Sequence, residues 1–221
     1  MAGQSARTAP VSEPAAPARR SKISPERERE FFAAVLDQLR EHGYESVTME
    51  GVAARVRCGK STLYRQWGSK PRFVAAALRS ERCPRFAGID TGSLAGDLRA
   101  AAHAAGTESC DDTRLLHALG HTTLQDHELQ RALCEALVEP ELAALDAMLA
   151  RAEARGEIGA AHPAAEYVAA LLFGVTRVRP QLEGRFADPA YLIGLVDAVI
   201  LPAFGLAVPP RPAADGASPA P

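Results

Sequence analysis

The chain has 221 residues, of which 47% are hydrophobic and 5% aromatic, and its formal net charge is −2. This length suits one large domain or two small ones, and the abundance of Ala, Leu, Arg and Glu favours helices over strands. No apolar run approaches the roughly 18–20 residues of a membrane span, and the N-terminus lacks the apolar stretch of a secretory signal. We therefore expect a cytoplasmic protein without a membrane partner.

Charge is divided unevenly along the chain. Residues 1–80 hold 14 Lys and Arg against 8 Asp and Glu, whereas residues 81–221 hold 11 against 19. A basic first third joined to an acidic remainder favours a polyanion-binding unit attached to a body with another role, although chance clustering would give the same counts. The cysteines form no C-x-x-C pair, so we expect reduced thiols and no metal site. They are Cys58, Cys83, Cys110 and Cys134.

The helices expected from the sequence fill most of the chain between two disordered ends. Residues 1–23 and 209–221 are rich in Pro and Ala and lack periodicity, so we expect disorder in both. Ser24 and Pro25 are typical of a helix start, and Gly43 of a helix end. Later helices are expected over residues 49–56, 60–66, 71–82, 93–105, 112–123, 126–154, 164–179 and 189–206. No segment shows convincing β alternation, which predicts an all-α fold, and Pro140 is expected to kink the longest helix.

Residues 59–67 read GKSTLYRQW, and the first three letters resemble the end of a nucleotide-binding phosphate loop. That loop needs a glycine at position 54, where this chain has Ala54, and a preceding strand, where it has the helical segment MEGVAAR. A short helix capped by Thr48, a turn over RCG and a helix from Lys60 instead predict a helix-turn-helix, whose second helix enters the DNA major groove. Its expected core is Val47, Val52, Ala53, Val56, Cys58, Leu63 and Trp67. Its expected outer face is Lys60, Ser61, Thr62, Tyr64 and Arg65, whose side chains suit phosphate and base contacts.

The segment GYESVTMEGVAARVRCGKSTLYRQWGSKPRFVAAAL resembles the DNA-binding region of the TetR family of bacterial transcriptional regulators. The match extends from Gly43 through Phe73, about 30 residues, and the pattern is highly specific. Two positions depart from it: Arg57 stands where the turn usually has glycine, so the turn is expected to be strained or altered, and Gly59 replaces the common serine cap.

The resemblance implies a role for individual residues. Thr48 corresponds to a position that contacts a backbone phosphate, and Tyr64 to a tyrosine that does the same. Lys70 corresponds to the lysine at the start of the fourth helix that reaches the DNA backbone. The recognition helix would present Lys60, Ser61, Thr62, Tyr64 and Arg65, while Trp67 corresponds to a core aromatic.

The resemblance also implies how the chain is organised. It predicts a helix-turn-helix DNA-binding domain over residues 24–80 and an effector-binding and dimerisation domain over 81–208. Segments AALLFGVTRVRPQLEG and YLIGLVDAVILPAFG resemble the two helices through which the family dimerises. Their expected dimerisation residues are Val168, Leu171, Leu172, Val175, Leu192, Leu195, Val196 and Val199. The last helix is apolar nearly all round, which also fits a helix buried within its own domain.

The function implied is that of a regulator, most simply a repressor. It would bind a pseudo-palindromic double-stranded DNA operator as a homodimer and be released by an unknown small-molecule effector. The alternatives are an activator, a ligand-independent regulator, a helical adaptor protein, or a phosphate-binding enzyme that uses the GKS segment.

Candidate pocket residues are Leu98, Leu116, His117 and His121, although such leucines also suit an ordinary core. The His117–His121 pair lacks the further ligands of a zinc site, and no catalytic combination of side chains is evident. We expect neither a cofactor nor enzymatic activity.

Overall fold

The computed structural model describes residues 23–82, 84–107 and 110–207, and this part of the chain is all-helical, as the sequence predicts. In chain order the helices are α1 (Pro25–His42), α2 (Met49–Arg55), α3 (Lys60–Trp67), α4 (Lys70–Ser80), α5 (Leu94–Gly106), α6 (Cys110–Thr123), α7 (His127–Leu133), the π-helical η1 (Cys134–Val138), α8 (Glu139–Ala154), α9 (Ala165–Glu183), α10 (Pro189–Leu195), the π-helical η2 (Val196–Ile200) and α11 (Leu201–Ala203). The disorder expected in the two ends concerns residues outside the described ranges, apart from Ile23.

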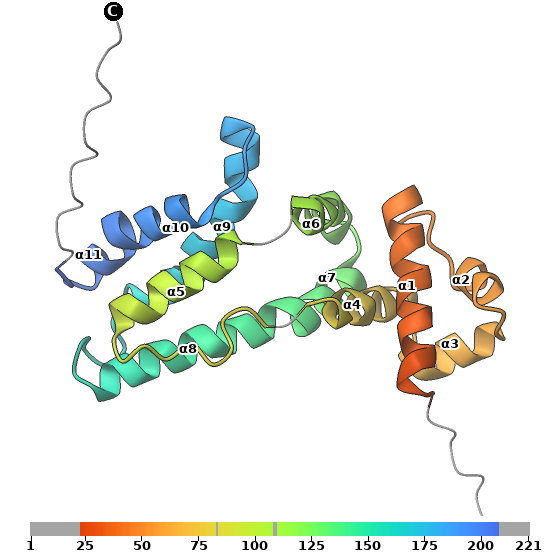
Figure 1. Ribbon diagram of the computed structural model, residues 1–221, viewed down its shortest axis with the longest axis horizontal. Coiled ribbons are helices and arrows are strands. Elements are labelled where there is room, and N and C mark those ends of the chain that lie inside the picture. The colour runs from red at the N-terminus through yellow and green to blue at the C-terminus, as the bar shows by residue number, and fades with distance from the viewer. Residues whose placement is uncertain (1–22, 83, 108–109, 208–221) are drawn as a thin grey trace, which may run out of the picture.

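Helices α1, α2 and α3 gather at one end of the molecule, and α5, α9, α10 and α11 lie toward the other (Figure 1). Between them, α4 packs against α1 on one side and against α7 on the other. None of the described helices is long and apolar enough to cross a lipid bilayer.

Short-range capping explains where the N-terminal helices begin and end. The backbone N–H of Arg27 donates to Ser24 Oγ at 3.3 Å, and that of Gly51 donates to Thr48 Oγ1 at 3.0 Å. Gly43 ends α1 with a φ of 75°, a conformation that costs glycine little. Each of these three caps was expected from the sequence.

The α1–α4 unit has a continuous apolar core. Its aromatic centre stacks Trp67 on Phe73 with ring centroids 4.3 Å apart, and Phe31 meets Trp67 edge-on at 5.7 Å. The expected helix-turn-helix core is confirmed: five of its residues are buried, and Cys58 and Trp67 are half-buried against them. The same cluster continues into α6 and α7 through Leu119, Leu129, Ala132 and Leu133. Helices α1–α4 therefore share their core with the body rather than folding around a separate one.

A second core occupies the body, where α5 packs mainly against α10. The contact is close because Gly106 has no side chain: a Cβ placed there would lie 2.4 Å from the backbone nitrogen of Pro189. The end of α5 and the start of α10 thus approach at a distance that only glycine allows.

The long helix expected over residues 126–154 is three consecutive elements in the structure. After α7 the chain widens into the π-helical η1, and α8 follows with Pro140 in its first turn. The residue four positions before Pro140 is Ala136, which lies inside η1. Because a proline ring clashes with the carbonyl group four residues earlier, a wider π turn at that point accommodates it. The same arrangement recurs where Pro202 follows η2.

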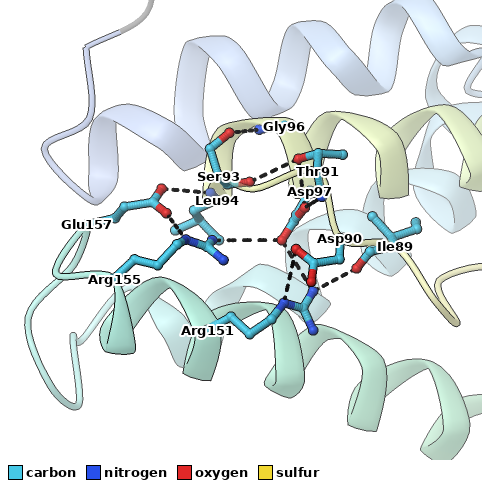
Figure 2. A network of polar contacts seen from close by, with 10 residues as sticks. All are labelled: Ile89, Asp90, Thr91, Ser93, Leu94, Gly96, Asp97, Arg151, Arg155 and Glu157. Atoms are coloured by element: carbon cyan, nitrogen blue, oxygen red, sulfur yellow. Dashed lines mark hydrogen bonds and ion pairs between the residues drawn. The ribbon is translucent and has the colours of Figure 1, made fainter.

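A buried carboxylate ties the start of α5 to the end of α8 (Figure 2). Asp97 is fully buried, and its Oδ1 accepts hydrogen bonds from the backbone N–H and the hydroxyl of Thr91, at 2.6 and 2.7 Å. Its Oδ2 accepts from Arg151 Nη2 at 3.3 Å, and Arg151 also donates to the carbonyl of Ile89 at 2.7 Å. Burial raises the pKa of Asp97, but these hydrogen bonds and the charge of Arg151 outweigh it and hold the pKa below its ordinary value.

Candidate nucleic-acid interface

Helix α3 turns one face to the core and the other to solvent. Leu63 is buried, whereas Lys60, Ser61 and Arg65 are exposed and Tyr64 retains 42% of its surface. Thr62 is half-buried. The preceding turn is tight, and Arg57 adopts a φ of 50° there, so the strain expected from a non-glycine residue at this position is present.

Lys60 does not point freely into solvent. Its ammonium forms an ion pair with Glu50 of α2 and lies 5.8 Å from the centre of the Tyr64 ring. The hydrogen bond to Glu50, and then its charge, raise the pKa of Lys60, while the same hydrogen bond lowers the pKa of Glu50. Glu50 was missed by the sequence reasoning, because a ten-residue separation across a turn does not indicate contact. For Lys60 to contact DNA, it must exchange this partner for a phosphate or a base.

Lys70 stands at the start of α4 and is half-buried. Its Nζ donates to the carbonyl oxygen of Tyr44 at 3.2 Å and lies 4.0 Å from the centre of the Tyr44 ring. Thr48 is exposed, with its hydroxyl oxygen already accepting the N-cap hydrogen bond. The contacts of the described residues thus join Lys60 to Tyr64 but connect neither Lys70 nor Thr48 to the α3 side chains.

The residues at the start of α7 are bonded to the loop after α1 and to the N-cap of α4, beside Lys70. Tyr44 donates its hydroxyl to Asp126 Oδ2 at 3.2 Å, and Ser69 donates to Glu128 Oε1 at 2.6 Å. Burial, and then the charge of Asp126, raise the pKa of Tyr44. The sequence indicates Asp126 only as the start of a helix. Its partner, 82 residues earlier, is visible only in the fold. We call these two hydrogen bonds, from Tyr44 in the loop after α1 and from Ser69 at the cap of α4, the α4–α7 contact.

A cavity of about 420 Å³ lies beside this contact, within the range of small-molecule sites. Its walls come from the residues that follow α4, from α5, α6, α7, η1 and α9, and from the residues just before α10. The expected pocket residues do not all lie at this cavity. Leu98 is buried in the core of the body, where α5 packs on its neighbours, and His121 is exposed beside Gln125. Neither lines the cavity, and the side chains of Leu116 and His117 lie outside the described part of the structure.

The expected dimerisation residues divide into two groups. Val168, Leu172, Leu192 and Val196 are buried within their own chain and so cannot form the surface of an interface. Leu171, Val175 and Leu195 are half-buried, and Val199 keeps 45% of its surface.

The more exposed group belongs to a larger apolar surface, which we call the α9–α10 face. On α9 it comprises Tyr167, Leu171, Val175, Val178 and Leu182, and on α10 and η2 it comprises Tyr191, Leu195 and Val199. The two helices are joined by the guanidinium of Arg179, which lies 3.5 Å from the centre of the Tyr191 ring.

The GKS segment has no phosphate-loop geometry. Gly59 follows a turn at the end of helix α2, whereas a phosphate loop follows a strand. Over the described residues, no group of three or more His, Cys, Asp or Glu is placed to hold a metal ion. Cys58 and Cys134 are free, half-buried thiols.

Two family models match the chain. Residues 32–77 match bacterial regulatory proteins of the tetR family, and residues 89–199 match the tetracyclin repressor-like C-terminal domain. An HTH-type transcriptional regulator of Mycobacterium tuberculosis is 32% identical over 180 residues, covering 80% of this chain and 87% of its own. The DNA-binding transcriptional repressor TetR of Mycobacteroides abscessus is 32% identical over 185 residues, covering 77% and 90%.

Solved structures agree with this. The TetR family transcription regulator SCO0332 is 25% identical with a TM-score of 0.56, over 79% of this chain and 97% of its own. A TetR-family regulator from Rhodococcus sp. gives a TM-score of 0.62 at 18% identity, over 80% and 100%, which shows a shared fold.

Proposed function

Because the chain belongs to the TetR family of bacterial transcriptional regulators, we propose that it is a repressor that binds a pseudo-palindromic operator as a homodimer and is released by a small-molecule effector. The observation that carries the proposal is the solvent-facing side of α3, on which Lys60, Tyr64 and Arg65 stand together on a helix-turn-helix.

On DNA, each exposed group of α3 has a chemical role. Arg65 has no ion pair among the described residues, so its guanidinium is available to a guanine edge or a phosphate. The Tyr64 hydroxyl suits a backbone phosphate. Lys60, Ser61 and Thr62 occupy the first turn of α3, and the backbone N–H groups at a helix N-terminus also attract anions.

The α9–α10 face supports dimerisation. Its exposed apolar side chains recur at helical spacing on two neighbouring helices, and burial of such a surface against its own copy removes it from water. A single recognition helix reads only a few base pairs, whereas two related by a twofold axis read a palindrome. The four residues buried within the chain support the helices from behind, and the exposed ones would form the interface.

The α4–α7 contact supports control by an effector. Gln130 and Leu133 of α7 line the cavity. At the start of the same helix, Asp126 and Glu128 accept hydrogen bonds from Tyr44 and Ser69 of the N-terminal unit. A ligand that binds one position of α7 better than another would shift the DNA-binding helices by its differential affinity, typically about 1–3 kcal/mol.

The test is DNA binding by purified protein to fragments selected from the source genome, followed by anisotropy titration of the selected operator at several salt concentrations. Affinity for the operator should fall steeply as the salt concentration rises, because the bound protein neutralises phosphates of the DNA backbone. Tyr64→Ala and Lys70→Ala should weaken binding to all sequences alike. Lys60→Ala and Thr62→Ala should cost about 1–3 kcal/mol where a base contact is lost and should change sequence preference.

A matched control is Arg131→Ala, which removes an exposed charge from α7 away from α3 and should leave operator affinity unchanged. Wild-type affinity in all four of the other variants would refute the assignment of the interface. Failure of the wild-type protein to bind any genomic fragment at low salt would refute the proposed function itself.

A further inference from the structure

The outer face of α3 carries two cations with different surroundings. Lys60, at the first position of the helix, forms an ion pair with Glu50 of α2, whereas Arg65, in the last turn, has no ion pair among the described residues. The side chains of Lys60 and Glu50 keep 54% and 57% of their surface, so water reaches both charged groups. Burial therefore does not hold this pair together, and its two groups can separate when a third charge approaches.

Glu50 lies next to predicted DNA contacts on both helices. It is two residues after Thr48, in the exposed first turn of α2, and its carboxylate contacts Lys60 at the start of α3. Alone, a carboxylate at this place would be repelled by DNA phosphates, and a lysine ammonium would be attracted. When the two are paired their charges cancel, so together they add little to the attraction between the protein and the DNA backbone.

This pairing affects the two modes of DNA binding unequally. Affinity for arbitrary DNA comes almost entirely from phosphates that Lys and Arg neutralise. If Lys60 moves from Glu50 to a phosphate, it exchanges one anionic partner for another and leaves the carboxylate unpaired beside a polyanion, so the net gain is small. On the operator, contacts from Tyr64 and Arg65 would hold α3 in the groove, where the Lys60 ammonium can donate to both acceptors of a guanine edge.

We propose that Glu50 is a specificity-determining residue, which withholds Lys60 from the phosphates of non-operator DNA and releases it only where a base edge replaces the carboxylate. The inference rests on the proposed binding of an operator through α3, and it adds a residue that contributes by opposing a DNA contact. Specificity is a difference between two affinities, so a group that lowers the weaker affinity more than the stronger one increases the preference for the operator.

The experiment compares the wild-type protein with Glu50→Gln, which keeps the size of the side chain and removes its charge. The full chain is titrated by anisotropy onto the selected operator and onto a scrambled duplex of equal length, at physiological and higher salt. Affinity for the scrambled duplex should rise about threefold to tenfold, and its salt dependence should steepen by about one phosphate, because Lys60 is then free to neutralise one. Affinity for the operator should change less, so the ratio of the two affinities falls.

A second comparison separates the release of Lys60 from the mere removal of a repulsive charge. Glu50→Gln is introduced into the Lys60→Gln variant, where no ammonium remains to be released. The gain on the scrambled duplex should then be less than about twofold, because at physiological salt the charge of an exposed carboxylate is largely screened beyond about 8 Å. A gain as large as the one measured with Lys60 present would show that Glu50 acts by its own charge and would overturn the proposal.

Glu81→Gln is the matched control. Glu81 is also an exposed glutamate in an ion pair, in this case with Arg40 at 2.5 Å, and neither residue belongs to α3. This variant should leave both affinities unchanged. Circular dichroism melts establish that each variant is folded, since Glu50 stands in the first turn of α2, where a carboxylate stabilises the helix.

The outcomes distinguish this inference from the function on which it rests. An unchanged or increased preference for the operator in Glu50→Gln would overturn the inference while leaving operator binding intact. Failure of the wild-type protein to bind any genomic fragment would instead refute the proposed function itself.

Discussion

At the scale of single residues, Arg57 is the position where local sequence and backbone conflict. It holds a φ of 50° in the turn between α2 and α3, a region that costs a residue with a Cβ roughly 1–2 kcal/mol. Arg57→Gly should therefore stabilise the protein by about 0.5–1 kcal/mol, after allowance for the larger unfolded-state entropy of glycine. Urea denaturation measures the change. Ala54→Gly, inside α2, is the opposite case and should destabilise by about 1 kcal/mol. A loss of stability in Arg57→Gly would contradict the strain argument.

At the scale of elements, the approach of α5 to α10 depends on Gly106. An alanine there would place its Cβ 2.4 Å from the backbone of Pro189, which cannot rotate away as a side chain can. Gly106→Ala should therefore force the two helices apart and cost about 1–3 kcal/mol in the free energy of unfolding, the usual penalty of overpacking. Gly159→Ala, where a Cβ meets no atom within 4 Å, should change stability by less than about 0.5 kcal/mol. Equal thermal melts for the two variants would show that α5 and α10 are not held this closely.

At the scale of the whole molecule, the α9–α10 face predicts a change of oligomeric state. Val199→Asp places a charge in the proposed interface and should convert the dimer to monomer and weaken operator binding. The measurement is light scattering coupled to size-exclusion chromatography. Leu124→Asp introduces the same charge at a leucine that is 78% exposed beyond α6, and it should remain dimeric. A wild-type monomer, or a dimeric Val199→Asp variant, would contradict the proposed interface.

Stability at low pH is also a property of the whole molecule, because it depends on carboxylates in two distant contacts. The pKa of Asp97 and that of Asp126 both lie below their ordinary values, the latter chiefly through the hydrogen bond from the backbone N–H of Leu129. A carboxylate whose pKa is lower in the folded protein than in the unfolded chain stabilises the fold at pH values above its unfolded-state pKa. That stabilisation is lost as the pH falls through the folded-state pKa. Melting temperature should thus fall below about pH 4, and Asp97→Asn should make the fall shallower while lowering stability at pH 7. Asp90 is an exposed partner of the same Arg151, so Asp90→Asn should change neither the low-pH fall in melting temperature nor the stability at pH 7 appreciably.

Much of the candidate DNA-binding surface could be predicted from local sequence. The Ser24 and Thr48 caps, the turn at Arg57 and the inward face of α3 all depend on residues within a few positions of each other. The face of α3 that remains exposed follows from helical periodicity alone. For the same reason the TetR resemblance, which depends on a contiguous segment, identified the family.

Other features were decided only when distant segments met. The spacing of Val168, Leu172, Leu192 and Val196 shows that a helix face is apolar, but not whether its own chain or a partner covers it, and the structure buries these residues internally. The cavity, the α4–α7 contact and the pairing of Lys60 with Glu50 likewise join residues that periodicity does not relate. Helical spacing determines which side chains share a face, because hydrogen bonding within a helix is local. What that face meets is decided by the packing of complete helices, in which one missing Cβ at Gly106 or one proline after a π turn sets the geometry.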